Sequence, residues 1–411
     1  MAIKNENSYT YHIQHDRGRK NLAILELIRK KGPISRADIS RILGYNIVTI
    51  SNYIDFYINK RIILEVGLDI SSGGRRPELV ELNAKCAYIA GVDVGPNVIQ
   101  ATITDLKVNV IHKTKRPRSA MSMEDLAAEV VEIIADAIKN SKISPSSIKN
   151  IGIGISGIVD YNSGTIRDTD PTRGRTKVSF LKFAKTIERE FNIPAYIGND
   201  ASCAAFGEKI LNPATDVENL LYIYSDVGCG IIIHGEVYSG SSGCAGETQL
   251  VFDTLQRNEK NYLKEYTFMR PWGVDLGLIL EAKKAIEKGI STEIINLAKA
   301  KNPEDINIDA VIEAATKKKD KLAIELINNA GKNLGIRVAY LVNFINPDVV
   351  VIGGGIERAG DYLLEPVKES VRRFAFEEAS SIVKIIPSFL GEDAVILGAA
   401  ALAAREIFIQ A

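Results

Sequence analysis

Polar residues and glycine stand where several apolar stretches of this chain end. Ser156-Gly157 follow IGIGI, Asn199-Asp200 follow AYIG, and Asp93 follows YIAGV. Hydroxyl, amide and carboxylate groups of this kind can bind a polar ligand, because such a ligand needs both hydrogen-bond donors and acceptors from its pocket. Asn-Asp is also a common capping pair, so this dipeptide by itself indicates a helix cap.

The stretches that carry these residues alternate strand and helix from residue 87 onward. The first half predicts strands at 88–95, 98–106 and 108–115, a helix at 123–140 and two later strands. A similar order recurs from residue 220, which predicts two related α/β lobes with a cleft between them. Ligands of open α/β folds bind at the carboxyl ends of strands, where these polar residues stand, as do Gly228 and Gly353-Gly354-Gly355.

The N-terminal segment predicts three helices. The first covers 18–31, the second begins at a Ser35-x-x-Asp38 capping signal, and after Gly44 the third begins at Asn46. Apolar spacing directs one set of side chains inward: Ile39, Ile42, Leu43, Ile47, Ile50, Ile54 and Tyr57. A helix-turn-helix fits a major groove, and a docking bundle is the alternative. The expected DNA contacts in these helices are Arg36, Asn46, Thr49, Ser51, Asn52 and Tyr53.

A basic hairpin follows these helices. Residues 61–66 alternate like a strand and can pair with 79–82, and Arg75 and Arg76 project from the glycine-rich tip between them. Two arginines on a narrow loop suit a minor groove, where A·T tracts concentrate negative potential. A solvated surface hairpin is the alternative interpretation. Beside a helix-turn-helix, the pattern favours a wing that binds DNA.

Bulk composition restricts the remaining classes. Residues 1–86 carry 14 Lys and Arg against 9 Asp and Glu, although the 411-residue chain has no net charge. A basic module on an acidic body fits one end that faces phosphate. No apolar run is long enough for a membrane span, which predicts a cytoplasmic protein. The scattered cysteines suit reduced thiols better than disulfides or a zinc site: Cys86, Cys203, Cys229 and Cys244.

The motifs GVDVG, GISGIVD, GNDA, GCAGE, VVVIGGG and GAAALA follow one another along the chain. In this order they resemble the ROK family of repressors, open-reading-frame proteins and sugar kinases, and SSGGRRPEL looks like the wing of its regulator branch. The resemblance covers nearly the whole chain. It implies an α/β, actin-like (ribonuclease H-like), two-lobed sugar-kinase fold preceded by a winged helix-turn-helix domain.

The resemblance also implies a set of ligand contacts. Asn199 and Asp200 match the family's sugar-contacting pair, Glu247 matches a further sugar contact, and Ser156-Gly157 match a loop that lines the same pocket. In the family's kinases, the aspartate at position 200 is the general base that takes a proton from the attacked hydroxyl.

Two nucleotide loops depart from the kinase pattern. The family's Asp-x-Gly-Gly-Thr is here Asp93-Val-Gly95-Pro96-Asn97, and proline removes an N–H that a phosphate cradle would use. The second loop, Gly-Thr-Gly-x-Gly in the family, is here residues 224–228, where Asp226 would repel polyphosphate. Leu250 replaces the histidine of the family's zinc site, and no cysteine follows Cys244, so we expect no zinc.

These observations predict a sugar-responsive DNA-binding regulator, a repressor that releases operator DNA when a sugar or sugar derivative binds between the lobes. The expected domains are a winged helix at 1–86, a first lobe at 87–198 joined by the helix 393–411, and a second lobe at 199–392. We expect a homodimer on a palindromic operator, with no enzyme activity and no cofactor. The alternatives are an active kinase that uses ATP and Mg²⁺ through Asp200, and a regulator that responds to a partner protein.

Overall fold

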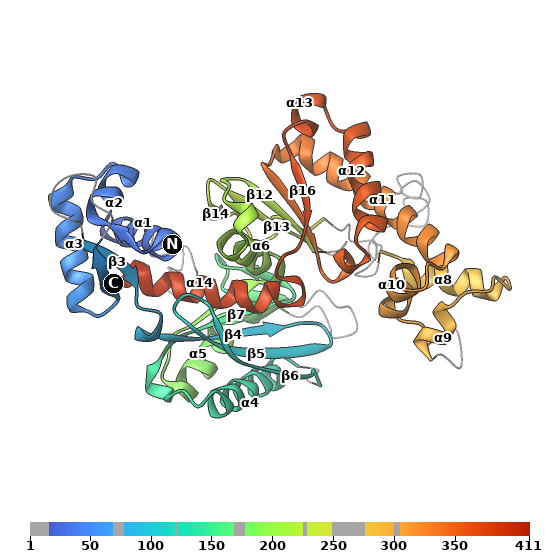
Figure 1. The fold of residues 1–411 in the computed structure, drawn as a ribbon. Coiled ribbons are helices and arrows are strands. Elements are labelled where there is room, and N and C mark those ends of the chain that lie inside the picture. The colour runs from blue at the N-terminus through green and yellow to red at the C-terminus, as the bar shows by residue number, and fades with distance from the viewer. Residues whose placement is uncertain are drawn as a thin grey trace. The chain divides into compact units, whose positions relative to one another are not determined.

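The structure is a computed structural model that describes residues 16–68, 78–119, 122–167, 177–224, 228–248, 276–299 and 305–411. The chain divides into two compact units, drawn in Figure 1. Unit 1 contains Met1–Cys203 and Val395–Ala411, and unit 2 contains Ala204–Ala394. The winged helix, the first α/β sheet and the last helix of the chain therefore lie in one unit.

Unit 1 begins with three helices and a small sheet, whose bounds are α1 Asp16–Lys31, β1 Ile34–Ser35, α2 Arg36–Leu43, α3 Ile47–Asn59, β2 Ile63–Leu68 and β3 Glu78–Leu82. The predicted caps are confirmed. The Ser35 side chain accepts a hydrogen bond from the Asp38 N–H, and Asn46 accepts one from Val48. Gly44 ends α2 with φ of 70°, a left-handed conformation that glycine adopts without strain. β3 pairs antiparallel with β2 and β1, so the strands of the predicted wing are confirmed.

Two apolar residues of this module do not lie where the spacing predicts. Ile39, Ile50, Ile54 and Tyr57 are fully buried, but Ile42 and Ile47 are each 44% exposed. The eight residues of α2 span little more than two turns, so the periodic pattern at the ends of α2 and α3 extends past the core that these helices share. The prediction that Ile42 and Ile47 point inward was wrong.

The first α/β sheet lies between helices on both faces. Its strands stand in the order β11-β7-β4-β5-β6, with β4 parallel to β7 and antiparallel to β5. Helices α4 and α5 cover one face and α14 covers the other (Figure 1). The bounds are β4 Tyr88–Val94, β5 Val98–Asp105, β6 Val110–Pro117, α4 Met123–Ser141, β7 Ile148–Ile155, α5 Phe180–Phe191, β11 Ala195–Asn199 and α14 Ala394–Gln410.

Glycines let α14 lie close against this sheet. A Cβ on Gly91 would stand 2.6 Å from the Ile396 carbonyl oxygen, and one on Gly152 would overlap the Ala399 carbonyl. Asn150, which is buried, donates its side-chain amide to the Ala403 carbonyl at 2.8 Å. Close backbone approach and a buried hydrogen bond therefore fix α14 to β4 and β7.

Unit 2 repeats the topology of the first sheet. Its strands stand in the order β14-β13-β12-β15-β16, with β12 antiparallel to β13 and parallel to β15, and this confirms the predicted repeat. The bounds are β12 Leu220–Tyr224, β13 Gly228–Ile233, β14 Glu236–Val237, α8 Leu278–Glu287, α9 Ile294–Ala298, α10 Ile308–Thr316, α11 Lys321–Ile345, β15 Val349–Gly353, α12 Asp361–Phe374, α13 Glu377–Ser380 and β16 Lys384–Pro387. Helix α6, Asp200–Leu211, crosses the boundary of the two units.

One small sheet was not predicted. Strands β8 Ile158–Asp160, β9 Thr165–Arg167 and β10 Lys177–Ser179 pair antiparallel directly after the loop at Ser156-Gly157. Three-residue strands leave almost no periodic signal, so the sequence pattern could not reveal them.

Candidate functional site

Four of the five predicted ligand contacts meet at the ends of β7 and β11. The Asn199 side-chain amide donates to the Gly157 carbonyl at 3.0 Å, and its oxygen accepts from the Ser202 N–H at 3.1 Å. Asp200 accepts side-chain hydrogen bonds from Ser156 and Asn199. Asn199 is thus a helix cap and also a tie to the neighbouring loop, so the capping interpretation and the site interpretation both hold. Parallel pairing of β7 with β11 brings the two loops side by side.

Electrostatics at this site favour a neutral Asp200 below pH 6. Burial raises the pKa of Asp200 from 3.8 to about 6, although hydrogen bonds from Ala201 N–H, Ser156 and Asn199 oppose the shift. Asp93 is a second buried carboxyl group and accepts a hydrogen bond from Gln100 at 3.3 Å. Burial, together with Asp200 and Asp93, raises the pKa of the Cys203 thiol well above its usual value. Cys203 is therefore protonated at neutral pH.

Glu247, the fifth predicted contact, belongs to unit 2 and is exposed. The backbone beside it is fixed, because the Cys229 N–H donates to the Gly246 carbonyl at 2.8 Å and a side chain at Gly246 would overlap Cys229. The role of Glu247 in sugar binding stays a prediction.

The first nucleotide loop forms a closed hairpin. The Gly95 N–H donates to the Val98 carbonyl at 3.0 Å, and the Gly95 carbonyl accepts from the Arg118 guanidinium at 3.2 Å. An N–H used in this way does not point toward a phosphate. Residues 225–227 of the second nucleotide loop, Asp226 among them, lie outside the described residues, and so does Leu250, which stands at the histidine position of the family's zinc site.

Within the described ranges, no group of three or more His, Cys, Asp or Glu is placed to hold a metal ion. In the same ranges, no helix combines the length and apolar character of a membrane span. The absence of zinc and of a cofactor stays a prediction.

The predicted DNA contacts divide into three groups. Asn52 is exposed, Thr49, Ser51 and Tyr53 are partly exposed, and Asn46 is exposed while it caps α3. Arg36 instead forms ion pairs, at 2.6 Å with Asp55 of α3 and at 3.5 Å with Glu65 of β2. Arg75 and Arg76 lie outside the described residues. The surface of α3 thus offers polar side chains, and Arg36 of α2 links α3 to strand β2 of the wing.

Two features of this module were missed by sequence reasoning. Val48 is 63% exposed in the first turn of α3, beside the polar positions. Val48 stands two residues after the Asn46 cap and off the apolar stripe that contains Ile50 and Ile54, so its position in the sequence could have predicted its exposure. The second feature is Asn21, a buried amide in α1 whose partners lie far away in the sequence, so no local pattern could have identified it.

Asn21 connects α3 to α14. The Tyr57 hydroxyl donates to the Asn21 side-chain oxygen at 2.8 Å, and both residues are buried. The Asn21 amide donates to the Ala411 carbonyl at 2.8 Å and to the Ile409 carbonyl at 3.3 Å. A continuous hydrogen-bonded path therefore runs from α3, through α1, to the end of the helix that lies on the first sheet.

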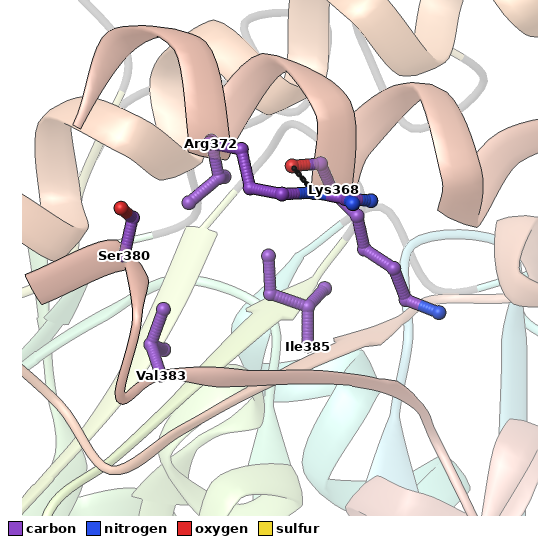
Figure 2. A pocket seen from close by; sticks show the side chains of 6 residues that line it. Lys368, Arg372, Ser380, Val383 and Ile385 are labelled. Carbon is purple, nitrogen blue, oxygen red and sulfur yellow. Dashed lines mark hydrogen bonds between the residues drawn. The ribbon is translucent and has the colours of Figure 1, made fainter. Parts of the chain in front are cut away.

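Unit 2 contains a small hollow lined by residues of α12, α13 and β16 and by Val383. Figure 2 shows Lys368 and Arg372 of α12 on one side and Val383 and Ile385 on the other. The Arg372 side chain donates to the Lys368 carbonyl at 3.3 Å. The volume of the hollow, about 200 Å³, is below that of ordinary small-molecule sites.

Comparison with known proteins agrees with this architecture. The model of the ROK family matches residues 89–253 and 280–406, so the chain belongs to the ROK family. A putative xylose repressor of Caldicellulosiruptor sp. (strain Rt8B.4) is 32% identical over 389 residues, which cover 93% of this chain and 94% of that protein. The transcriptional dual regulator NagC of Escherichia coli (strain K12) is 25% identical over 386 residues, with 93% and 91% covered.

Solved structures show the same fold. A ROK family transcriptional regulator, described as a homologue of the E. coli MLC protein, superposes with a TM-score of 0.75 over 97% of this chain and 98% of its own, at 22% identity. A ROK glucokinase from Streptomyces griseus has a TM-score of 0.63 over 77% of this chain and 99% of its own, at 21% identity. The predicted family and the predicted winged, two-lobed α/β fold are confirmed.

Proposed function

We propose that this chain is a sugar-responsive transcriptional repressor, and that xylose or a sugar of similar hydroxyl pattern is its effector. One juxtaposition carries the proposal: unit 1 contains both a capped helix-turn-helix with a winged hairpin and the hydrogen-bonded group at Ser156, Asn199 and Asp200. Full-length similarity to proteins named xylose repressor supports the choice of sugar.

The polar groups at the end of β11 suit a polyhydroxyl ligand. Asp200 in its ionised form accepts hydrogen bonds from two hydroxyls, and Asn199 and Ser156 add donors and acceptors beside it. Partial burial raises the strength of such contacts over those in water. The bound sugar thus replaces water on groups that the fold already holds in place by hydrogen bonds.

Sugar occupancy must favour one state of the DNA-binding module for regulation to work. The Asn21 path gives this coupling a physical route, because α14 lies on β4 and β7 and its last carbonyls hold α1, which in turn holds Tyr57 of α3. Two further contacts join the module to the first sheet. The Leu106 N–H donates to the Ala84 carbonyl, and Lys107 pairs with Glu81 at 3.7 Å.

We further propose that the chain has no sugar kinase activity. Pro96 carries no N–H, and the Gly95 N–H is used within its own hairpin, so the first loop has little to offer a polyphosphate. One observation favours the rival: Asp200, the residue that serves as base in the family's kinases, keeps its place beside Asn199. Sugar-dependent release of ADP from ATP and Mg²⁺ that is lost in Asp200→Asn would establish the kinase.

The test of the regulatory function is DNA binding with and without sugar. Duplexes selected from a random pool by the wild-type protein serve as the probe, and fluorescence anisotropy gives the Kd. We expect xylose to raise this Kd at least tenfold, and Asn199→Ala to remove the effect while DNA binding remains. N-acetylglucosamine and glucose are the comparison sugars. An unchanged Kd with every sugar would overturn the proposal.

A further inference from the structure

Glu208 is a buried carboxylate of unit 2 that belongs neither to the proposed sugar site nor to the DNA-binding module. Its side chain is fully buried, and an ionisable group keeps such a position when hydrogen bonds satisfy it. One carboxylate oxygen accepts from the Ser388 hydroxyl at 2.5 Å and from the Leu390 N–H at 3.0 Å. The other accepts from the Asn212 side-chain amide at 2.9 Å. Glu208 therefore joins α6 to a segment 180 residues further along the chain.

These contacts lie where the chain passes from one unit to the other. The chain leaves unit 1 after Cys203, inside α6, and returns to it at Val395, in the first turn of α14. Glu208 comes shortly after the first passage, and Leu390 comes shortly before the second. α6 is one continuous helix, and α14 begins directly after the 3₁₀ turn Gly391–Asp393. Glu208 thus ties the two passages together on the side of unit 2.

The segment that precedes α14 has little freedom of its own. The Ser388 hydroxyl also accepts from the Gly391 N–H at 2.9 Å, and the Ser388 N–H donates to the Ile352 carbonyl at the end of β15 at 2.8 Å. Hydrogen bonds to an ionised acceptor such as Glu208 are stronger than those between neutral groups. Because these bonds hold the segment at several points, a shift of α6 carries the segment with it.

The two helices that Glu208 connects lead to the two functional parts of unit 1. α6 begins at Asp200, the proposed acceptor for the sugar, about two turns before Glu208. α14 ends at the Ile409 and Ala411 carbonyls, which accept from Asn21 of the DNA-binding module. Helix shifts of about 1–2 Å are a common form of allosteric change. A shift that begins at Asp200 therefore has a continuous route to Asn21.

We propose that Glu208 is a positioning residue of the sugar response, because it makes α6 and the first turn of α14 move together when sugar binds at Asp200. The proposal rests on the proposed function, since the response that Glu208 transmits is the effect of sugar on DNA binding. Glu208 contacts neither ligand in this account. Loss of its tie to the α14 segment should therefore reduce the response and leave both separate affinities in place.

The experiment compares two variants that each remove one hydroxyl beside Glu208. Ser388→Ala removes the hydrogen bond that reaches the α14 segment. Thr215→Val is the matched control, because the Thr215 hydroxyl donates to the Glu208 and Asn212 backbone carbonyls, at 2.6 and 2.8 Å. Fluorescence anisotropy gives the response factor, which is the Kd for DNA with xylose divided by the Kd without it.

We expect a response factor of at least about ten in the wild type and in Thr215→Val, and of less than about three in Ser388→Ala. The Kd for xylose, and the Kd for DNA without sugar, should stay within about twofold of the wild type in both variants. Glu208→Gln should restore a larger factor than Ser388→Ala, because glutamine keeps an oxygen that accepts from Ser388 and Leu390.

Three results would overturn the proposal. The first is a full response in Ser388→Ala. The second is an equal loss in Ser388→Ala and Thr215→Val with equally lowered thermal transitions, because Glu208 would then act on stability alone. The third is a Glu208→Gln variant that responds no better than Ser388→Ala.

Hydrogen exchange tests the connection without any sugar. Ser388→Ala should speed amide exchange in α14 and in α1 by at least about threefold, whereas Thr215→Val should leave exchange in α1 unchanged. Exchange in α1 of Ser388→Ala that equals the wild type would overturn the proposal. A wild type that responds to no sugar, but in which Ser388→Ala speeds exchange in α1, would count against the proposed function alone.

Discussion

Glu406 allows a quantitative test of how α14 is buried. The residue lies in α14, its side chain is fully buried, and neither carboxylate oxygen has a hydrogen-bond partner among the described residues. Burial raises the pKa of Glu406 from 4.5 to about 8, although Arg405 nearby opposes the shift. We predict that Glu406→Gln stabilises unit 1, and that the gain in the free energy of unfolding grows as the pH rises.

The magnitude follows from proton linkage. Above pH 4.5 the unfolded chain loses the Glu406 proton while the folded chain keeps it up to about pH 8, so the wild type loses stability as the pH rises through this window. One pKa unit corresponds to about 1.36 kcal/mol, so the loss between pH 5 and pH 9 is on the order of 4 kcal/mol. Glutamine has nearly the same shape and no charge to bury, so the variant escapes this loss.

Urea unfolding of both proteins at pH 5, 7 and 9 measures the difference, with hydrogen exchange of α14 to identify the transition that opens unit 1. Glu190→Gln, at an exposed glutamate of α5, is the matched control and should follow the wild type at every pH. A difference between wild type and Glu406→Gln that stays constant from pH 5 to pH 9 would refute the reasoning, because it would mean that Glu406 is solvated or paired.

Three further predictions concern the two binding functions. Because Val48 is exposed on α3, we expect it to contact the methyl group of a thymine in the operator, so replacement of that thymine by deoxyuracil should weaken wild-type DNA binding about fourfold, from about 0.8 kcal/mol per buried methylene. The variant Val48→Ala should bind both duplexes with the same Kd, and an equal loss of affinity in the wild type and the variant, measured by competition anisotropy, would contradict this. Because Asp200 has a pKa of about 6, sugar affinity measured by calorimetry should fall as the pH falls below 6, and the variant Asp200→Asn should lose this pH dependence. A wild-type sugar affinity that does not change from pH 5 to pH 7 would exclude Asp200 as a hydrogen-bond acceptor for the sugar. The variant Tyr57→Phe leaves the buried Asn21 side-chain oxygen unpaired, at a cost of about 1–3 kcal/mol. It should therefore reduce the effect of xylose on DNA binding without changing the affinity for xylose. An undiminished xylose effect in this variant would show that the Asn21 path does not couple the two sites.

Local signals made much of the fold predictable from the sequence. The caps at Ser35 and Asn46 and the turn at Gly44 depend on neighbouring residues, and all three lie where predicted. The repeat of the two sheets was equally visible, because buried parallel strands are near-continuous apolar runs such as IGIGI. The contact of Asn199 with the Ser156-Gly157 loop was predictable from the position of both at the carboxyl ends of strands, because those ends meet at one edge of a parallel sheet.

Features that depend on distant partners were not predictable. Asn21 and Glu406 are ordinary polar residues by helical spacing, and only tertiary packing buries both and pairs one of them. The prediction that Ile47 is buried failed for the opposite reason: Ile47 lies on the apolar stripe of α3, but no element among the described residues covers it.

The most direct test of the central claim, that sugar bound at Asn199 and Asp200 controls DNA binding, is reciprocity between the two ligands. Calorimetry of xylose binding to the free protein and to the protein saturated with its selected duplex gives two values of Kd. Linkage requires that DNA weakens xylose binding by the same factor by which xylose weakens DNA binding, at least tenfold in this account. Equal xylose affinity with and without DNA would show that the two sites are independent and would contradict the account.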